Sequence, residues 1–359
     1  MFYHSPFREA FGLDIGDLSL KLVELSIAKK LPDKTIYKIN DHRQISLPAG
    51  CILGGEIQQP EIVRKKLIQL LDKAGYNKKI KSPWVVADLP EPKTFLTSIE
   101  LDLLPEQISR EDVELNSRQH LPFNLEDAYL SYEVIPRIDS QTTTRVLIGA
   151  VEKIIADSYT YLLESANLQP IALEIEGLAI ARAVLEQKST SGGIILDLGA
   201  TRSAIIIYDQ GGIRFSTSLN FSGEMINVAL SQQIKIDYQK IEQLKIKTGL
   251  NYTKEFPNYL KIVDGLIGKL TDDINKVLNY YQNHYPNTQT IEKIVLCGGL
   301  STMDNLRETL IRRLKIYCEF ANPWKNIAIK DHPLDKKSGL TMVSAIGLAM
   351  RATLNPYNE

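Results

Sequence analysis

The strongest constraint on the fold is a repeated unit of two strands joined by a tight turn. The first copy reads FGLDIGDLSLKLVELS and the second reads GGIILDLGATRSAIIIYD. In each copy an apolar strand ends in Asp-x-Gly, at Asp14 and Gly16 and again at Asp197 and Gly199, and a second strand follows. Such an internal duplication indicates a chain built from two similar halves.

The Asp-x-Gly turn has a definite chemistry. Glycine lets the backbone approach a phosphate closely, with its amide N–H groups turned inward. An aspartate at the strand end holds Mg²⁺ through the waters that this ion retains. One such turn is commonplace, but two copies from two halves are suited to enclosing one polyphosphate. Gly298 and Gly299 follow an apolar strand and precede a helix, so we expect them to form a wall for adenosine.

The composition argues against several other classes of protein. The 359 residues are 44% hydrophobic and 24% charged, as in a globular protein with a core. Lys+Arg number 42 and Asp+Glu number 43, so the basic excess of a nucleic-acid binder is missing. The cysteines, Cys51, Cys297 and Cys318, form no C-x-x-C pair, which argues against structural zinc and suits a reducing compartment. Because the sequence shows neither a signal-peptide pattern nor a long apolar run, we expect a cytoplasmic protein.

The predicted elements divide the chain into segments. Residues 94–166 form a compact α+β stretch, which we expect to be an inserted subdomain. The polar stretch KSTSGG, residues 188–193, is the expected linker. A helical region is predicted at 223–285, with one helix ending at Gly249. After the Gly-Gly turn a further helix is predicted, with these caps: Ser301, Thr302 and Asp304.

Together these motifs resemble the PilM family of type IV pilus assembly proteins. The similar stretches include FGLDIGDLSLKLVEL, LNSRQHLPFNLEDAYLSYEVIP, ILDLGATRSAIIIY, IEKIVLCGGLSTMDNLRETL with ANPWKNI, and the closing AIGLAMR. The resemblance covers about residues 11–352. It implies an α/β fold of the actin-like type, shared with Hsp70 and sugar kinases, in which two lobes enclose the nucleotide and an FtsA-type subdomain, 1C, is inserted in the first lobe.

The resemblance also assigns the segments to subdomains. On this reading subdomain 1A comprises 1–93 and 167–190, 1C comprises 94–166, 2A comprises 191–233 and 286–359, and 2B comprises 234–285.

The function implied by the resemblance is that of an adaptor. Members of the family bind ATP with Mg²⁺ and turn it over slowly or not at all. The N-terminal cytoplasmic tail of the membrane protein PilN docks in a groove near 1A and 1C, and the adaptor links PilN to the pilus motor ATPases. In this chain the apolar residues around LPFNLEDAYL are candidates for that groove, although Leu121 and Phe123 also suit a subdomain core.

The family pattern implies a set of nucleotide-binding residues. Asp14 and Asp197 are the expected magnesium residues, acting through water. The complete set is Asp14, Gly16, Asp17, Lys21, Asp197, Gly199, Ala200, Thr201, Gly223, Glu242, Lys245, Gly298, Gly299 and Met303. Four members have simpler interpretations: Lys21 suits a surface strand, Glu242 and Lys245 suit a helical ion pair, and Met303 suits core packing.

The chain departs from the family pattern at several positions. Asp17 stands where Ser or Thr is usual, and a carboxylate beside a triphosphate is repulsive unless a cation compensates. Ser203, Ser222 and Asn227 also replace the usual residues. Together these departures leave open whether the chain binds nucleotide weakly or not at all. Three alternative functions also stay open: a small-molecule kinase of the superfamily with Asp88 as its base, an FtsA-like division protein, and a scaffold like GspL of type II secretion.

Overall fold

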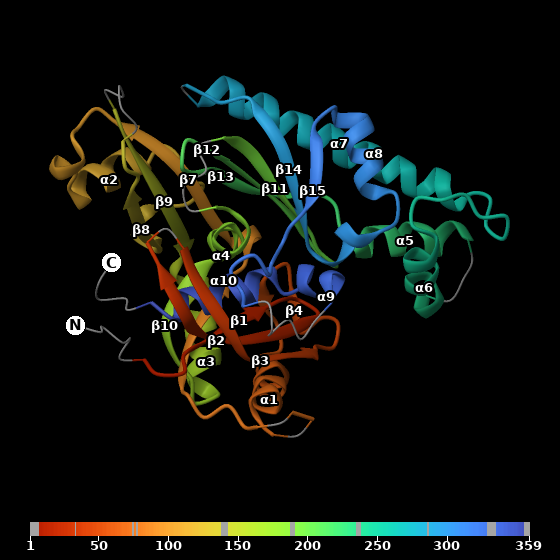
Figure 1. Ribbon diagram of the computed structural model, residues 1–359, viewed down its shortest axis with the longest axis horizontal. Coiled ribbons are helices and arrows are strands. Elements are labelled where there is room, and N and C mark those ends of the chain that lie inside the picture. The colour runs from red at the N-terminus through yellow and green to blue at the C-terminus, as the bar shows by residue number, and fades with distance from the viewer. Residues whose placement is uncertain are drawn as a thin grey trace. The chain divides into compact units, whose positions relative to one another are not determined.

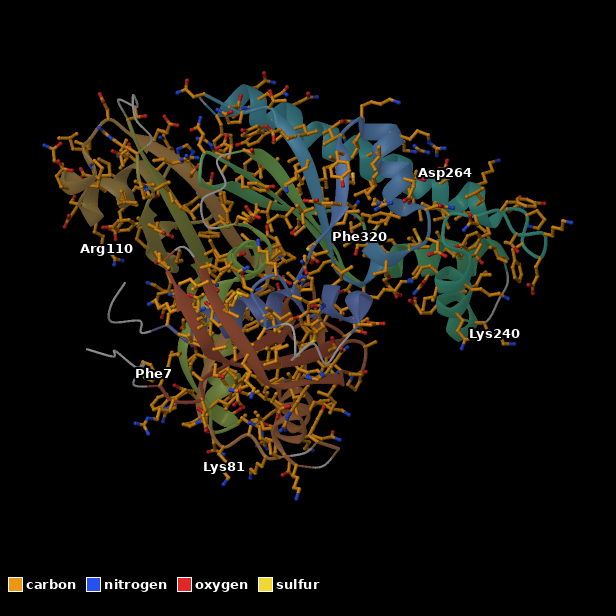
Figure 2. All side chains as sticks on the ribbon, in the orientation of Figure 1. Phe7, Lys81, Arg110, Lys240, Asp264 and Phe320 are labelled. Carbon is orange, nitrogen blue, oxygen red and sulfur yellow. The ribbon has the colours of Figure 1, made fainter. Side chains whose placement is uncertain are left out.

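The chain forms two compact units, the first made of Met1–Lys188 and Asn322–Glu359 and the second of Ser189–Ala321 (Figure 1). The computed structural model describes residues 7–32, 34–73, 75–76, 78–137, 143–186, 191–234, 238–285, 287–328 and 335–354. Residues 188–190 of the expected linker lie outside these residues, and Gly192 and Gly193 begin a strand. Among them, no helix has the length and apolar character needed to cross a membrane. Exposed charged side chains such as Lys81, Arg110 and Lys240 occur on both units (Figure 2).

The first unit is built on a five-stranded sheet with the order β10-β6-β1-β2-β3. Its strands are β1 (Phe11–Ile15), β2 (Ser19–Leu31), β3 (Lys34–Ser46), β6 (Trp84–Leu89) and β10 (Gln169–Ile175). β1 runs antiparallel to β2 and parallel to β6, so the Asp-x-Gly turn lies between adjacent strands at the centre of the sheet. The alternation of strand side chains gives each face its own apolar set.

Helices cover both faces of this sheet. On one face, α1 (Pro60–Leu71) and α3 (Lys153–Ser165) bury apolar residues against alternate side chains of β1, β2 and β6. On the other face, α4 (Glu176–Val184) and α10 (Val343–Ala352) pack against Ala10 and Val86. A short hairpin of β4 (Ile52–Leu53) and β5 (Glu56–Ile57) precedes α1.

Three antiparallel strands in the order β7-β9-β8, here called the three-stranded sheet, complete the first unit. Its strands are β7 (Thr94–Leu101), β8 (Ala128–Val134) and β9 (Thr144–Glu152). α2 (Arg110–Ser117) packs on one face, where Val113 meets Ile99, Leu101, Val146 and Ile148. α2 begins with a capping box, because Ser109 and Asp112 each bond to the other's backbone N–H.

The second unit contains five strands in the order β15-β14-β11-β12-β13. They are β11 (Gly192–Leu198), β12 (Ser203–Asp209), β13 (Gly212–Leu219), β14 (Ile291–Cys297) and β15 (Tyr317–Phe320). The helices are α5 (Gly223–Ile234), α6 (Tyr238–Thr248), α7 (Tyr259–His284) and α8 (Leu306–Leu314), with α7 and α8 contributing to one large apolar core. Both predicted strand–turn–strand units are therefore present, and α6 ends before Gly249 as predicted.

The family resemblance assigned 191–233 and 286–359 to subdomain 2A. In the structure α10 packs against β1 and α4 at very close range, and Asn322–Glu359 groups with the first unit. A Cβ on Gly12 would lie 2.3 Å from the Ala349 nitrogen, and one on Gly347 would lie 1.8 Å from the Ala179 oxygen. Small residues on both sides make this contact possible, and the sequence pattern alone did not reveal the pairing.

Two local predictions were also corrected. α3 was expected in the inserted α+β segment, yet its buried face, including Tyr159 and Leu163, joins the core of the five-stranded sheet. The predicted caps Ser301 and Thr302 lie in a 3₁₀ turn, where their hydroxyls bond to the carbonyls of that turn. α8 begins only at Leu306, after Asn305 in the left-handed region, because the turn after the Gly-Gly pair is longer than predicted.

Candidate functional site

The first Asp-x-Gly turn is a rigid, largely buried loop in the first unit. The Gly16 N–H donates to the Ser19 carbonyl at 3.0 Å, which closes the turn between β1 and β2. Asp14 is 3% exposed, and the Lys21 ammonium donates to its carboxylate at 2.8 Å from the directly paired position on β2. Lys21 is thus an ion-pair partner at the loop rather than a solvated surface lysine.

Three buried carboxylates gather beside this turn. Oxygens of Asp14, Asp88 and Glu176 all lie within 4.8 Å of one another. Asp88 is the penultimate residue of β6 and accepts a hydrogen bond from the Ile15 N–H at 2.8 Å, while Glu176 is the first residue of α4. Oxygen ligands of this kind suit Mg²⁺. Sequence reasoning missed Glu176, although its place between a strand and a helix in LEIEGLA is a usable signal.

Asp17 does not need a phosphate or a metal to account for its position. Its carboxylate accepts hydrogen bonds from the N–H groups of Gly54 at 3.1 Å and Gly55 at 3.2 Å, in the turn between β4 and β5. The side chain is only 6% exposed. The departure from the family pattern therefore has a structural partner, and the repulsion inferred from sequence is offset by two amide donors.

The second turn repeats the geometry of the first in the second unit. The Gly199 N–H donates to the Arg202 carbonyl at 3.0 Å, as Gly16 does to Ser19. The carbonyls of Gly199 and Ala200 accept from the first two N–H groups of α5, those of Gly223 and Glu224. The turn is therefore held directly on the N-terminus of a helix, where the helix dipole favours a negative charge.

Glu242 and Lys245 form a polar cluster next to this helix end. Lys245 is 5% exposed and donates to Glu242 at 2.6 Å and to Asn227 at 3.0 Å. Its ammonium lies 3.2 Å from where a Cβ on Gly223 would stand. The helical ion pair expected as the simpler interpretation is present, and it is directed towards the second turn.

The Gly-Gly turn after β14 also packs against the second turn. Gly298 has φ +80°, and a Cβ there would lie 2.4 Å from the Leu198 carbonyl and 2.6 Å from the Asp197 carboxylate. Only glycine fits this approach. Met303, in contrast, is buried in the apolar core of the second unit. Its position favours packing over contact with a base.

The structure therefore groups the predicted residues into two sets. Asp14, Gly16 and Lys21 lie together in the first unit, with Asp17 directed to the neighbouring hairpin. The set in the second unit is Asp197, Gly199, Ala200, Gly223, Lys245, Gly298 and their sequence neighbours. Each set places glycines beside an aspartate and a lysine.

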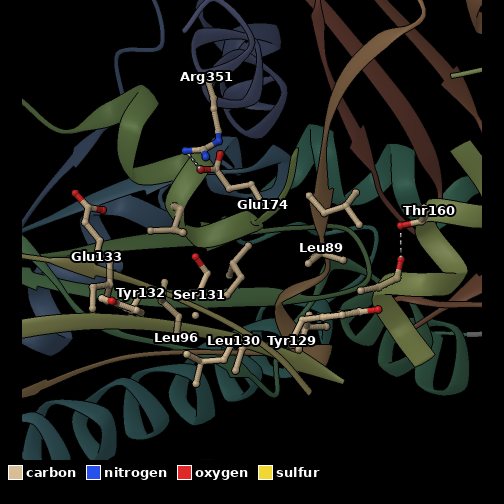
Figure 3. A pocket seen from close by; sticks show the side chains of 18 of the residues that line it. Leu89, Leu96, Tyr129, Leu130, Ser131, Tyr132, Glu133, Thr160, Glu174 and Arg351 are labelled. Atoms are coloured by element: carbon tan, nitrogen blue, oxygen red, sulfur yellow. Dashed lines mark hydrogen bonds and ion pairs between the residues drawn. The ribbon is translucent and has the colours of Figure 1, made fainter. Parts of the chain in front are cut away.

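A separate groove of about 1090 Å³ lies wholly within the first unit, between the three-stranded sheet and the helices α3 and α4 (Figure 3). Its floor is the face of the sheet that carries the alternate residues Leu96, Leu147, Gly149 and Val151. Ala156, Asp157 and Thr160 of α3 form one wall, and residues of β10 and α4 form another. Such a mostly apolar concave site is typical of ligand binding.

Polar groups are concentrated at fixed points of the groove. Glu174, with a 4% exposed side chain, accepts two hydrogen bonds from Arg182 and lies 3.6 Å from Arg351. Figure 3 shows the Arg351 guanidinium beside the Glu174 carboxylate, with residues of β8 across the groove. On the α3 side the Tyr129 hydroxyl donates to Asp157, and this bond raises the pKa of the phenol.

One edge of the groove is an open strand. β8 pairs with β9 and with no other strand among the described residues. Ile135, just beyond β8, donates to the Arg145 carbonyl, and bonded residues alternate along an antiparallel pair. By that alternation the backbone groups of Leu130 and Tyr132 point to the open edge. Both residues line the groove, whereas Leu121 and Phe123 do not.

Comparisons with known proteins agree with this architecture. A family model described as "Type IV pilus assembly protein PilM" matches residues 12–353. Among solved structures, the chain is similar to one titled "PilM-PilN type IV pilus biogenesis complex", with TM-score 0.79, 21% identity, and coverage of 97% of this chain and 100% of that chain. It also resembles MreB 5 of Spiroplasma citri bound to AMPPNP, with TM-score 0.55, 11% identity and 95% coverage of both chains.

A curated relative extends the same comparison to cell division proteins. The cell division protein FtsA of Buchnera aphidicola subsp. Schizaphis graminum is 20% identical in an alignment of 278 residues, which covers 65% of this chain. That match spans 66% of the relative, just under two thirds of its length. The similar structures show an actin-like fold, and the family model shows to which family with this fold the chain belongs.

Proposed function

This chain belongs to the type IV pilus assembly protein PilM family, and we propose that it is an ATP-binding adaptor whose groove holds the extended N-terminal tail of a PilN-type partner. The groove within the first unit carries the proposal, because it combines an apolar floor, fixed polar groups and an open strand edge. The partner would hold the chain at the cytoplasmic side of the inner membrane. The family resemblance implies the pilus motor ATPases as further partners.

The groove favours an extended peptide over a compact ligand. Backbone groups of Leu130 and Tyr132 at the open edge are available to a strand added beside β8, and main-chain hydrogen bonds supply affinity in such pairing. Side chains of an added strand alternate, so every second one projects into the groove from the same face of the sheet as Leu147, Gly149 and Val151. The missing side chain at Gly149 leaves room there for an apolar anchor.

Nucleotide binding is assigned to the two Asp-x-Gly turns. Gly16 and Gly199 supply close backbone approach, and Lys21 and Lys245 supply positive charge beside them. The phosphates and the buried carboxylates near Asp14 are all negatively charged. Mg²⁺ bound with the phosphates would offset this negative charge. In this chain Asp14, Asp88 and Glu176 are suited to hold that ion.

Calorimetry with two ligands tests the proposal. Mg-ATP and a synthetic PilN N-terminal peptide are titrated separately into the wild type and into Asp14→Ala. We expect both ligands to bind the wild type, and Asp14→Ala to lose nucleotide affinity while it retains the peptide. Peptide binding without any nucleotide binding would mark a scaffold that has lost its ATP site. Sugar-dependent formation of ADP would overturn the adaptor and favour the kinase alternative.

A further inference from the structure

A continuous set of contacts joins the first Asp-x-Gly turn to the wall of the groove. It begins at Asp17, whose carboxylate accepts from the N–H groups of Gly54 and Gly55. These two glycines form the turn of the β4–β5 hairpin, with φ of +55° and +83°. The Asp17 side chain of the first Asp-x-Gly turn therefore holds the tip of the β4–β5 hairpin.

The same hairpin tip is fixed from its other side by α3. The Gly55 carbonyl accepts a buried hydrogen bond from the Tyr159 hydroxyl at 2.9 Å. A Cβ on Gly55 would lie 2.5 Å from Pro90, which follows the groove residue Leu89. Lys93 adds an ion pair to Glu56 of β5. The tip is thus enclosed by the phosphate turn, by α3 and by the segment after β6.

α3 carries this connection into the groove. Tyr159 is fully buried, and its neighbours Ala156 and Thr160 line the groove. Ala156, three residues before Tyr159, lies on the same side of the helix, and Thr160 is the next residue along the chain. A shift of the helix at Tyr159 therefore moves both lining residues. Ile155, Leu162 and Leu163 bury the same helix independently of the hydroxyl, so we expect α3 to stay folded when the Tyr159 hydroxyl is removed.

We propose that Asp17 and Tyr159 are positioning residues that couple nucleotide in the first Asp-x-Gly turn to peptide in the groove, with each ligand strengthening the binding of the other. The inference rests on the proposed function, since it requires both ligands. Its sign follows from charge. Phosphates at the turn repel the Asp17 carboxylate towards the Gly54 and Gly55 amides, which tightens the hairpin against Tyr159. Packed networks of this kind transmit coupling between sites.

The test measures a ratio of affinities rather than an affinity. The peptide dissociation constant is determined by calorimetry without nucleotide and with saturating Mg-ATP, in the wild type, Asp17→Asn and Tyr159→Phe. We expect about a fivefold gain for the wild type, at the low end of typical couplings. Each variant should still bind both ligands, with the ratio reduced to about one because the route is interrupted.

A matched control separates this route from the general loss of a tyrosine hydroxyl. Tyr259 in the second unit makes the same kind of buried bond, from its hydroxyl to the Gly249 carbonyl at 2.9 Å. Tyr259→Phe should keep the wild-type ratio. A wild-type ratio of one, or a full ratio in Tyr159→Phe, would overturn the coupling while both ligands still bind. Failure of the wild type to bind either ligand would instead overturn the proposed function.

Discussion

Filling the groove floor at Gly149 should block the peptide while leaving the fold intact. Gly149 lies between Leu147 and Val151 on the floor, and a Cβ there would stand 3.0 Å from the terminal methyl of Ile175. Ile175 can move by a few tenths of an ångström, so Gly149→Ala should be tolerated. The larger Gly149→Val side chain occupies the space that we assign to an apolar anchor of the peptide.

The expected loss follows from the burial of one side chain. Burying a Val- or Leu-sized anchor contributes about 1.5–3 kcal/mol, so its exclusion weakens binding by about 10- to 150-fold. The effect of Gly149→Val on the free energy of unfolding is smaller, because two contributions oppose each other. A β-branched residue favours the strand by up to about 1 kcal/mol, whereas crowding costs about 1–3 kcal/mol.

Peptide titration by calorimetry, paired with a thermal melt, checks this expectation. Gly149→Ala should fall between the wild type and Gly149→Val. Leu115→Ala provides the surface control, since Leu115 is 71% exposed on α2 of the same unit and lies outside the groove. Mg-ATP affinity reports on folding and should change little. If Gly149→Val bound the peptide as tightly as the wild type, the groove floor would not be the site of the anchor.

Three further changes probe the rest of the molecule. Arg214→Met should destabilise the second unit by about 3–5 kcal/mol in denaturant unfolding, because it leaves the buried Asp209 carboxylate without its cation; an unchanged midpoint would contradict this. Lys21→Met should weaken Mg-ATP binding without affecting the peptide, because it removes the cation beside Asp14; equal loss of both ligands would point to misfolding. The side-chain hydrogen bond from Ser109, followed by its backbone N–H, lowers the pKa of Asp112. A group whose pKa is lower in the folded state stabilises the fold at pH values above its unfolded-state pKa, and this stabilisation is lost as the pH falls through the folded-state pKa. Asp112→Ala should therefore lower the melting temperature at neutral pH and not in strong acid.

Local patterns in the sequence predicted most elements correctly because each depends on near neighbours. The alternation of apolar and polar residues in LKLVELSI is typical of a strand with one buried face, and β2 is such a strand. Gly249 adopts a left-handed conformation, which ends α6. The doubled Asp-x-Gly turn likewise predicted both loops. The placement of α10 against β1 could not be predicted in this way, because Gly12 and Gly347 are distant in sequence and their fit depends on tertiary packing.

The groove escaped prediction for a related reason. Its floor comes from β7 and β9, its walls come from α3, β10 and α4, and Arg351 enters from the end of the chain. No contiguous motif encodes such a site. The candidate stretch LPFNLEDAYL reached it only at its end, through Tyr129 and Leu130, because strand alternation and edge position determine exposure there.

The role of Asp17 is misjudged from the local sequence and becomes clear only from its partners in the structure. Judged from its neighbours alone, it is an extra negative charge at a phosphate turn and argues against nucleotide. Its actual partners, the amides of Gly54 and Gly55, are far along the chain and satisfy the carboxylate with two hydrogen bonds. A serine or threonine there has one oxygen and cannot accept from both amides in the same bidentate way. The substitution thus exchanges a possible phosphate contact for a firm attachment of the hairpin that also holds Tyr159 and, through α3, one wall of the groove.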